Sequence, residues 1–562
     1  MPIDSASGAA NPLIMTPYMA DAPTKQRESR LLGAVSLAAV TIAAWILLTT
    51  AGCVMVASCN LPYADEWDLW TSLARRGYSL GWFLALHNDH RIATTRLIFA
   101  VDQLAFQAHI WFPQTVSLAA QAMLAAILLR FARRMSPAAP VDGILAGAIV
   151  GCLFSAQQSI NFIWGFQVQF FLVYMFAAAA LFALLRGCSA ASETSRSGWM
   201  AASLALAAAS TWSMANGVLI WPILVLAAVG LGARPIWIAL TAAAGAGILA
   251  LYFSGWHSSP LDAPAPATQI VSFALAHAGA PIVPLLRALG CGDAIRDITA
   301  TLAGAAVLGS ACWMWLQTWR SRGMDDKTRV PMLLANFALF AGAASFAIAA
   351  GRAHLPLVEA FRSRYVTPSY ILWVAVLILA WPRLHSRARI AVMLALAFGI
   401  APYQWAKLRD AGGYGAALRQ ASVALAAGVN DPDVRPYLLR PVTDSTEAAA
   451  WLRANRLAVF SEDWTGWVGR TAVAPTSCRG SVSDAVPVND LGRPGWRVTG
   501  SIEDGLNIVV LARRGAGTIE SSSPVISGRW TLYAHPGNGG VAIYGVRPDG
   551  KTLCTAAFHE LH

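Results

Sequence analysis

The stretch from Leu31 to Ala57 decides the fold of this chain, and it reads LLGAVSLAAVTIAAWILLTTAGCVMVA. It contains no charged residue and is longer than the roughly 20 residues that a helix needs to cross a bilayer. It also exceeds the length of a signal-peptide core, and further apolar segments follow it. Thr50–Cys53 resembles a lipoprotein cleavage signal, although threonine at its first position weakens that alternative. The pattern therefore predicts a membrane anchor.

The composition extends this interpretation to most of the chain. Of 562 residues, 56% are hydrophobic and only 13% are charged, whereas a soluble domain carries about 25% charged residues. Ten further apolar segments follow the first, at 113–129, 141–156, 168–185, 199–214, 216–232, 236–254, 296–319, 331–350, 367–382 and 389–406. We therefore expect a polytopic α-helical membrane protein with about eleven transmembrane helices, surrounded by membrane lipids.

The formal net charge of +11 comes from arginines and lysines that cluster in short loops. Cytoplasmic loops are enriched in these residues, so threading from a cytoplasmic N-terminus places inside Arg130, Arg133, Arg134, Arg186, Arg196, Arg234, Arg320, Arg322, Lys327, Arg329, Arg383, Arg387 and Arg389. The segment 268–288 is then re-entrant or lies at the outer face, because a full crossing would move the Arg320 cluster outside. A basic stripe interleaved with aromatics on a soluble domain is missing from the sequence, so we expect no nucleic-acid partner.

These assignments divide the chain into a disordered cytoplasmic tail (1–30), a transmembrane domain (31–406) with a first outer loop at 58–112, a helical connector (407–455) and a periplasmic β-rich domain (456–562). Helical patterns cover 413–428 and 444–455, and short β-rich runs cover 506–512 and 530–534. We expect the last domain to be a small β-sandwich or jelly-roll. If it lies outside the cytoplasm, a disulfide between Cys478 and Cys554 is plausible.

The first outer loop begins with an acidic motif, Asp65-Glu66-Trp67-Asp68. The stretches 69–86 and 91–107 that follow have patterns typical of helices lying along a membrane interface. Three carboxylates this close repel one another unless they share a proton, a cation or a basic partner. One of them can act as a general base toward a hydroxyl, and together they can hold a divalent cation. The alternative is a solvated acidic turn that caps a helix.

The same loop continues with His87-Asn88-Asp89-His90-Arg91. The motif supplies imidazoles, a carboxylate, an amide and a guanidinium, which transfer protons or bind ligands and anions. A polar turn between two interfacial helices is the alternative. Because both motifs share one loop and can converge, we expect His87, Asp89, His90 and Arg91 to contact a substrate.

A second charged outer loop follows the segment 331–350, against the topological bias, and contains Arg352, His354, Glu359, Arg362, Arg364 and Tyr365. Guanidinium groups bind phosphate oxygens through two parallel hydrogen bonds, so a lipid-linked phosphate at the membrane interface is the expected ligand. Ion pairing with Glu359 or with the acids of the first loop is the alternative. The amide-rich stretch 157–169, which includes Gln167, is typical of a sugar site or of aromatic packing at the interface.

In its motifs and its architecture, the chain resembles a poorly characterised bacterial branch of the GT-C superfamily, integral-membrane glycosyltransferases that use polyprenyl-phosphate-linked sugars. The motifs that carry the resemblance are Ala64–Asp68, His87–Arg91, Asn161–Gln167, Ala215–Gly217 and Ser363–Tyr365. The resemblance implies that Asp65 is the catalytic base or orients the acceptor, with Glu66 as the next candidate and Asp68 as a metal ligand or supporting group. It also implies that Arg352, Arg362 and Arg364 hold the donor phosphate, and that a divalent cation (Mg or Mn) is required only in some branches.

The expected function is transfer of a sugar from a polyprenyl-phosphate donor to a cell-envelope glycan or lipid-linked acceptor, at the periplasmic face of a bacterial inner membrane. An O-antigen ligase or polymerase is one alternative, weakened by the position of the acidic motif and by the external tail. A transporter or lipid flippase is another, but such proteins keep ionisable residues near the midplane, often in two related halves. The tail lacks a Trp-Trp-Asp type signature, which counts against transfer to protein asparagine.

Overall fold

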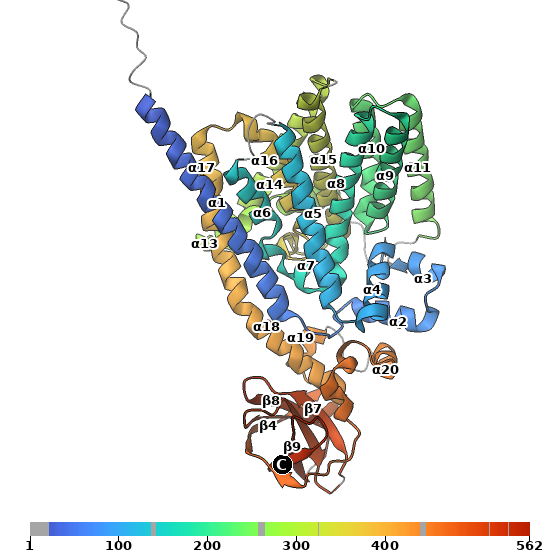
Figure 1. Ribbon diagram of the computed structural model, residues 1–562, viewed down its shortest axis with the longest axis vertical. Helices are drawn as coiled ribbons and strands as arrows, with labels where there is room; N and C mark the ends of the chain where they lie inside the picture. The colour runs from blue at the N-terminus through green and yellow to red at the C-terminus, as the bar shows by residue number, and fades with distance from the viewer. Residues whose placement is uncertain are drawn as a thin grey trace, which may run out of the picture.

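The computed structural model describes residues 22–135, 142–256, 265–323, 325–438, 446–515, 517–537 and 539–562. In Figure 1 a helical bundle forms the upper part of the molecule, and the C-terminal domain lies below it. We call the end of the bundle nearest to this domain the domain face. Residues 1–21 of the predicted tail lie outside the described residues, and the first helix, α1 (Ala22–Ala57), begins within that predicted tail.

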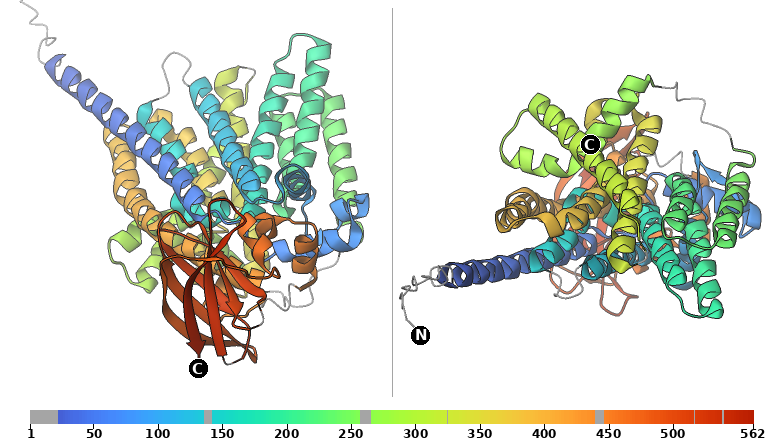
Figure 2. Two further views of the ribbon diagram at one scale, coloured as in Figure 1. Left: turned by 60° about the horizontal axis from the view of Figure 1, so that its bottom comes forward. Right: turned by 90° about the horizontal axis from the view of Figure 1, so that it is seen from above.

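The bundle is built from helices that lie side by side, and α1 extends away from the others at its N-terminal end (Figure 2, right). The remaining helices of the bundle are α5 (Trp111–Met135), α6 (Gly143–Leu153), α7 (Ser159–Ile163), α8 (Gln169–Cys188), α9 (Glu193–Thr211), α10 (Ile220–Gly230), α11 (Pro235–Phe253), α12 (Ala267–Ala278), α13 (Val283–Ala288), α14 (Asp293–Arg320), α15 (Asp326–Arg352), α16 (Thr367–Ala380), α17 (Ser386–Ala395) and α18 (Ala401–Ala427).

Eight helices in the described ranges are long and apolar enough to cross a membrane, or nine if the bent pair α12 and α13 counts as one span. They coincide with eight of the predicted segments. The other three segments, 199–214, 216–232 and 367–382, correspond to the helices α9, α10 and α16, which do not meet the same criteria of length and apolar character. The multi-pass helical membrane protein is confirmed, whereas the predicted number of about eleven spans is not.

The ambiguous segment 268–288 forms α12 and α13, which meet at an angle of 46°. Gly279 lies at the bend, where an added Cβ would come within 1.8 Å of the Ala300 carbonyl oxygen of α14. Gly304 of α14 is equally close to the backbone of α12, so the two helices cross in direct main-chain contact, which only glycine permits.

Both flanks of this bent pair lie at the domain face. On one side, the Ser254 carbonyl accepts a hydrogen bond from Arg91 of the first loop. On the other side, the Arg296 guanidinium lies 5.5 Å from the ring centre of Phe361, in the loop after α15. Ser254 before the pair and Arg296 after it thus lie at the same end of the bundle, in agreement with the re-entrant alternative.

The first loop forms three short helices at the domain face (Figure 1), which are α2 (Glu66–Arg76), α3 (Leu80–Leu84) and α4 (Ala93–Phe106). The prediction of one helix over 69–86 is wrong. Gly77 adopts a φ of 58° and ends α2, and the Ser79 side chain then accepts a hydrogen bond from the Trp82 N–H and caps α3. The helix predicted over 91–107 is confirmed as α4.

α18 continues from the bundle to the C-terminal domain without a break at the predicted boundary between residues 406 and 407 (Figure 2, left). It packs along α1, and an added Cβ at Gly415 would come within 2.4 Å of the Val56 carbonyl oxygen. The chain then forms α19 (Arg435–Leu438), α20 (Thr446–Ala454) and the 3-10 turns η8 (Ala458–Ser461) and η9 (Asp463–Trp467).

The C-terminal domain consists of two sheets. The five-stranded sheet has the order β3 (Thr476–Ser477), β10 (Leu553–Leu561), β9 (Gly539–Val546), β6 (Ile508–Arg513) and β7 (Ile519–Pro524), and the three-stranded sheet has the order β4 (Gly480–Asp490), β5 (Arg493–Ile502) and β8 (Arg529–Ala534). Buried residues of both sheets, such as Val498, Leu532, Val509 and Ile543, share one core. The predicted β-sandwich is therefore confirmed, and so is the Cys478–Cys554 disulfide.

Candidate active site

The amide-rich segment connects the two charged loops at the domain face. The Ile160 N–H donates a hydrogen bond to Ser363 Oγ at 3.1 Å, and Asn161 Nδ2 donates to the Arg364 carbonyl oxygen at 3.2 Å. On its other side, the Phe166 N–H donates to Glu66 Oε1 at 3.3 Å. The amide-rich segment therefore contacts both of the charged loops that the sequence singled out.

Glu66 begins α2, and its side chain is turned inward, with 1% of the residue exposed. Oε2 accepts a hydrogen bond from the Tyr63 N–H at 3.1 Å, in addition to the Phe166 bond. Burial raises the pKa of Glu66 to about 8, although these two N–H groups lower it. The carboxyl group thus holds the first loop against the amide-rich segment, and its expected catalytic role stays a prediction.

Asp65 and Asp68 occupy the start of the same helix but are partly exposed. Asp65 is the N-cap residue of α2, and its side chain makes no capping hydrogen bond. The preceding residue, Ala64, has a φ of 49°, which is uncommon for a residue with a Cβ. The turn therefore separates the carboxylates, because Glu66 faces the interior while Asp65 and Asp68 reach the surface of the loop.

Asp65 lies near the arginine-rich loop by way of Tyr63. Burial raises the pKa of the Tyr63 hydroxyl, the charge of Arg364 lowers it, and the charge of Asp65 raises it. Both charges thus act on one phenol group. The Tyr63 ring also meets the Trp164 ring edge-on, with 5.1 Å between their centres. Tyr63 therefore joins the acidic motif to the aromatic rings of the amide-rich segment.

Arg352, Arg364 and Tyr365 form the basic side of the site. Arg352 Nε donates to the Tyr365 hydroxyl at 3.0 Å, and the Arg364 guanidinium lies 4.7 Å from the centre of the Tyr365 ring. Arg364 Nε is buried and has no hydrogen-bond partner within the described part of the chain. Since guanidinium N–H groups are strong donors to anions, this arrangement suits a phosphate.

Arg362 is placed differently from its neighbour Arg364. Its side chain is 62% exposed, and its guanidinium pairs with the Glu359 carboxylate, with Nε 2.9 Å from Oε1. This is the ion-pair alternative that the sequence left open for the loop. The structure thus separates Arg362 from the group formed by Arg352, Arg364 and Tyr365.

The motif His87–Arg91 forms a hairpin, in which His87 pairs with His90 across a two-residue turn. Asn88 adopts a φ of 51°, which asparagine tolerates. The His87 ring lies 4.9 Å from the Phe166 ring, centre to centre, and the Asp89 carbonyl accepts a hydrogen bond from Trp256 Nε1. Burial lowers the pKa of His90, the charge of Asp89 raises it, and the charge of Arg352 lowers it.

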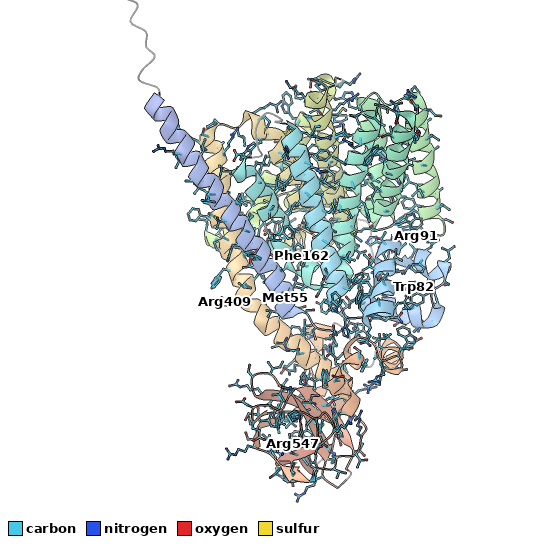
Figure 3. The ribbon with its side chains drawn as sticks, in the orientation of Figure 1. Met55, Trp82, Arg91, Phe162, Arg409 and Arg547 are labelled. Carbon is cyan, nitrogen blue, oxygen red and sulfur yellow. A yellow bond between two sulfur atoms is a disulfide. The ribbon has the colours of Figure 1, made fainter. Side chains whose placement is uncertain are left out.

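The Arg91 side chain binds main-chain groups of the protein. Its guanidinium donates to the main-chain carbonyls of Leu84, Tyr252 and Ser254. Figure 3 shows Arg91 between the lower end of α11 and the first loop. These bonds fasten the loop to the bundle, and the substrate contact expected of Arg91 stays a prediction.

Gln167 lies in the 3-10 turn η2 (Gly165–Val168) and is buried. Its N–H donates to the Trp164 carbonyl at 2.9 Å, whereas its Oε1 has no partner among the described residues. Its expected contact with substrate stays a prediction.

Sequence reasoning missed Asp102 of α4, which is 1% exposed. Burial and the charge of Glu66 raise the pKa of Asp102 to about 8. Asp102, Glu66 and Asn60 line one small cavity of about 10 Å³. Its only signal in the sequence was that it is the single acid within the otherwise weakly charged stretch 91–107. In the structure, Glu66 and Asp102 form a buried acid pair beneath the site.

The C-terminal region holds the first loop in place. Asn60 Nδ2 donates to the Glu462 carboxylate, and the Ala458 N–H donates to the Gln107 carbonyl at 2.8 Å. Trp67 Nε1 donates to the Leu438 carbonyl at 3.3 Å. Residues far apart in the sequence therefore fix the acidic motif relative to the bundle.

The described residues form no cluster of protein ligands for the divalent cation that the resemblance implies for some branches. Within the ranges that the structure describes, no three His, Cys, Asp or Glu side chains come together as a metal site. The separation of Glu66 from Asp65 and Asp68 is the physical reason.

No protein-family profile matches the chain, and no curated protein matches it. Among solved structures, the chain is similar to ArnT from Cupriavidus metallidurans in the apo state, with 14% identity over 77% of this chain and 93% of that chain and a TM-score of 0.42. The same protein bound to undecaprenyl phosphate gives 14% identity over 78% and 82%, with a TM-score of 0.37. The oligosaccharyltransferase of Archaeoglobus fulgidus, in complex with Zn and sulfate, gives 9% identity over 92% and 98%, with a TM-score of 0.38. At these values no activity or residue role is transferred from either protein to this chain.

Proposed function

We propose that this chain is a GT-C type glycosyltransferase, which transfers a sugar from a polyprenyl-phosphate donor to a cell-envelope glycan or lipid-linked acceptor. The observation that carries the proposal is that the amide-rich segment contacts both charged loops, at Glu66 and at Arg364, at one face of a membrane-embedded bundle. Such a transfer needs two groups, a carboxylate that accepts the proton of the acceptor hydroxyl and a guanidinium that stabilises the leaving phosphate.

In the proposed reaction, the acceptor hydroxyl attacks the anomeric carbon of the donor sugar. A new carbon–oxygen bond forms to the acceptor while the bond from the anomeric carbon to the phosphate oxygen breaks. The acceptor proton passes to the Asp65 carboxylate, and polyprenyl phosphate leaves as an anion. Arg364 and Arg352 stabilise the charge that develops on the leaving phosphate.

The neighbouring groups have supporting roles in this proposal. Tyr365 positions both arginines, because it accepts a hydrogen bond from Arg352 and stacks beneath Arg364. His90 stays neutral beside Arg352, since burial lowers its pKa, and therefore does not repel the guanidinium. Glu66 positions Asp65 by anchoring the first turn of α2.

The proposed location is the periplasmic side of a bacterial inner membrane, with the N-terminus in the cytoplasm. Ion pairs between basic and acidic loop residues, such as Arg234 with Glu193 and Arg389 with Asp142, join the loops at the face opposite to the domain face. The basic loops of the sequence gather there, and cytoplasmic loops carry this excess of arginine and lysine. The Cys478–Cys554 disulfide supports an oxidising compartment for the C-terminal domain.

A deletion strain tests the proposal without knowledge of the sugar. Mass spectrometry of surface glycans and lipid-linked precursors is expected to show that one sugar is missing from a glycan and that its lipid-linked donor accumulates. The gene for the wild-type chain restores the glycan, whereas the Asp65→Asn variant does not. An unchanged glycan profile in the deletion strain contradicts the proposal.

A further inference from the structure

A cavity of about 840 Å³ lies between α18 and the three-stranded sheet of the C-terminal domain. Ligand pockets typically measure roughly 300–1,000 Å³. On the helix side, its wall includes Gly413, Ala416 and Ala417, whose small side chains leave the space open. We call this cavity the domain cleft, and none of the motifs singled out in the sequence lies in it.

The strand side of the domain cleft presents polar groups from four strands, β4, β5 and β8 of the three-stranded sheet and β7 of the five-stranded sheet. Hydroxyl groups come from Ser483, Thr499, Ser501, Ser523 and Thr531. Hydroxyls donate and accept hydrogen bonds, and a row of them complements the hydroxyls of a saccharide. The chemistry of this wall therefore favours a polar, hydroxyl-rich ligand over an apolar one.

Two side chains in the cleft carry buried N–H groups without a partner. Trp530 is only 4% exposed, and its Nε1 meets no acceptor in the described part of the chain. Arg419 Nε is buried and equally without a partner there. Both side chains line the cleft, and their N–H groups lie beneath its surface.

The cleft also carries positive charge. Arg419 lies on the helix side, and the exposed Arg529 lies on the sheet side. Guanidinium groups on opposite walls match carboxylate or phosphate groups on one ligand. A neutral saccharide would leave both charges without a counterion.

The walls of the cleft are held at a fixed separation. Asp431, just after α18, accepts a hydrogen bond from the Tyr533 hydroxyl at 2.7 Å and from Arg497 Nη1 at 2.9 Å. Gln420 Nε2 donates to the same Tyr533 hydroxyl at 3.2 Å. These bonds tie α18 to β5 and β8, so the cleft is preorganised for a ligand.

α18 also connects the cleft to the candidate active site. Tyr414 and Leu418 of this helix line a small cavity together with Tyr63 and Glu66, while Ala416 and Ala417 line the domain cleft. One helix, roughly 10–12 Å across with its side chains, thus separates the two places. A ligand of several sugar units in the cleft can reach around α18 to Asp65.

We propose that the domain cleft binds an acidic oligosaccharide through the hydroxyl wall, Trp530, Arg419 and Arg529. Its identification with the glycan acceptor rests on the proposed function, whereas saccharide binding in the cleft does not. The cleft holds the chain of the acceptor, and its terminal hydroxyl lies at Asp65.

The test uses the full-length protein in nanodiscs and isothermal titration calorimetry with two acidic probes, tetragalacturonic acid and a heparin tetrasaccharide, and one neutral probe, maltotetraose. At least one acidic probe is expected to bind ten times more tightly than maltotetraose. Arg529→Ala lowers that affinity tenfold or more, and Ala416→Trp, which fills the cleft from an exposed position, abolishes it. Arg514→Ala is the matched control, because Arg514 is exposed and pairs with Glu560 on the other sheet, and it binds like the wild type.

Several results overturn the inference. These are the absence of binding by both acidic probes, unchanged binding by Arg529→Ala and Ala416→Trp, or full displacement of the tetrasaccharide by millimolar inorganic phosphate, which indicates a simple anion site. Asp65→Asn separates this inference from the proposed function, because it is expected to bind the saccharide normally. Normal binding together with undiminished transfer by Asp65→Asn contradicts the proposed function alone.

Discussion

Replacement of Arg364 with alanine is expected to weaken the binding of undecaprenyl phosphate by about 30-fold. Arg364 has a buried Nε without a partner within the described residues and lies over the Tyr365 ring. Hydrogen bonds from a guanidinium to a phosphate contribute about 2 kcal/mol net, and each 1.4 kcal/mol corresponds to roughly tenfold in affinity. Arg364→Lys keeps the charge but loses the two-pronged geometry, so we expect a loss between those of alanine and wild type.

Arg362→Ala provides the matched control, two residues away on the same loop. Its guanidinium is 62% exposed and paired with Glu359, and exposed ion pairs contribute about 0–1 kcal/mol. We therefore expect less than about a fivefold change in affinity, in keeping with that range. Both variants are expected to fold, because the hydrogen bond between Asn161 and Arg364 uses the main-chain carbonyl of Arg364 and not its side chain.

The assay is the titration of purified protein in nanodiscs with undecaprenyl phosphate, with thermal unfolding of each variant measured in parallel. The reasoning is refuted if Arg364→Ala binds as tightly as the wild type, or if Arg362→Ala loses as much affinity as Arg364→Ala. Either result means that the position of Arg364 over the Tyr365 ring has no connection with phosphate binding.

Three further changes probe the acids and the disulfide. Asp65→Asn is expected to reduce sugar transfer by about 10²–10⁴-fold, the usual contribution of a general base, at an unchanged melting temperature, and a normal rate rules out Asp65 as the base. Because the folded state raises the pKa of Glu66 and of Asp102 to about 8, it binds protons that the unfolded state has released, so stability falls as the pH rises from about 5 to 8. The Glu66→Gln, Asp102→Asn double variant is expected to make the melting temperature less dependent on pH. A slope equal to that of the wild type refutes the raised pKa of these two acids. Replacing both Cys478 and Cys554 with alanine is expected to destabilise the C-terminal domain by about 2–4 kcal/mol, measured by denaturant unfolding, and an unchanged midpoint argues against the bridge.

Much of the fold could be predicted because membrane helices and short strands depend on local composition. The apolar run Leu31–Ala57 is helical in the structure, and the β-rich runs 506–512 and 530–534 fall on β6 and β8. The break between α2 and α3 was missed, although Gly77 after two arginines is a readable end of a helix. The sequence predicted α9, α10 and α16 as spans because these segments are apolar. Too little weight was given to the short length or the polar residues of the helices.

The candidate site was only partly predictable, because its geometry depends on contacts between distant segments. The motifs were identified, but the sequence could not distinguish Arg364, which lies over the Tyr365 ring, from Arg362, which pairs with Glu359 three residues earlier on a 3-10 turn. The same limit applies to Arg91, whose partners are main-chain carbonyls of α11 and its end. Main-chain acceptors leave no trace in a sequence, whereas acidic partners do.

The burial of Glu66 could not be predicted from the sequence either. Three acids in four residues indicate a shared charge or an exposed turn, and the structure instead sends one carboxylate inward to the N–H groups of Tyr63 and Phe166. The domain cleft was missed for a related reason. Its residues come from α18 and several strands, and hydroxyl residues spaced along strands read as an ordinary solvent-exposed sheet.

The most direct test of the central claim is the release of polyprenyl phosphate by the purified protein. Wild-type and Asp65→Asn proteins are reconstituted in liposomes with the lipid-linked sugars and glycans extracted from the deletion strain, and the lipids are followed by mass spectrometry. The wild type is expected to convert a lipid-linked sugar into free polyprenyl phosphate with a matching gain of one sugar on the acceptor, while Asp65→Asn does not. Movement of the intact lipid-linked sugar across the bilayer without its cleavage would contradict the account and favour a flippase.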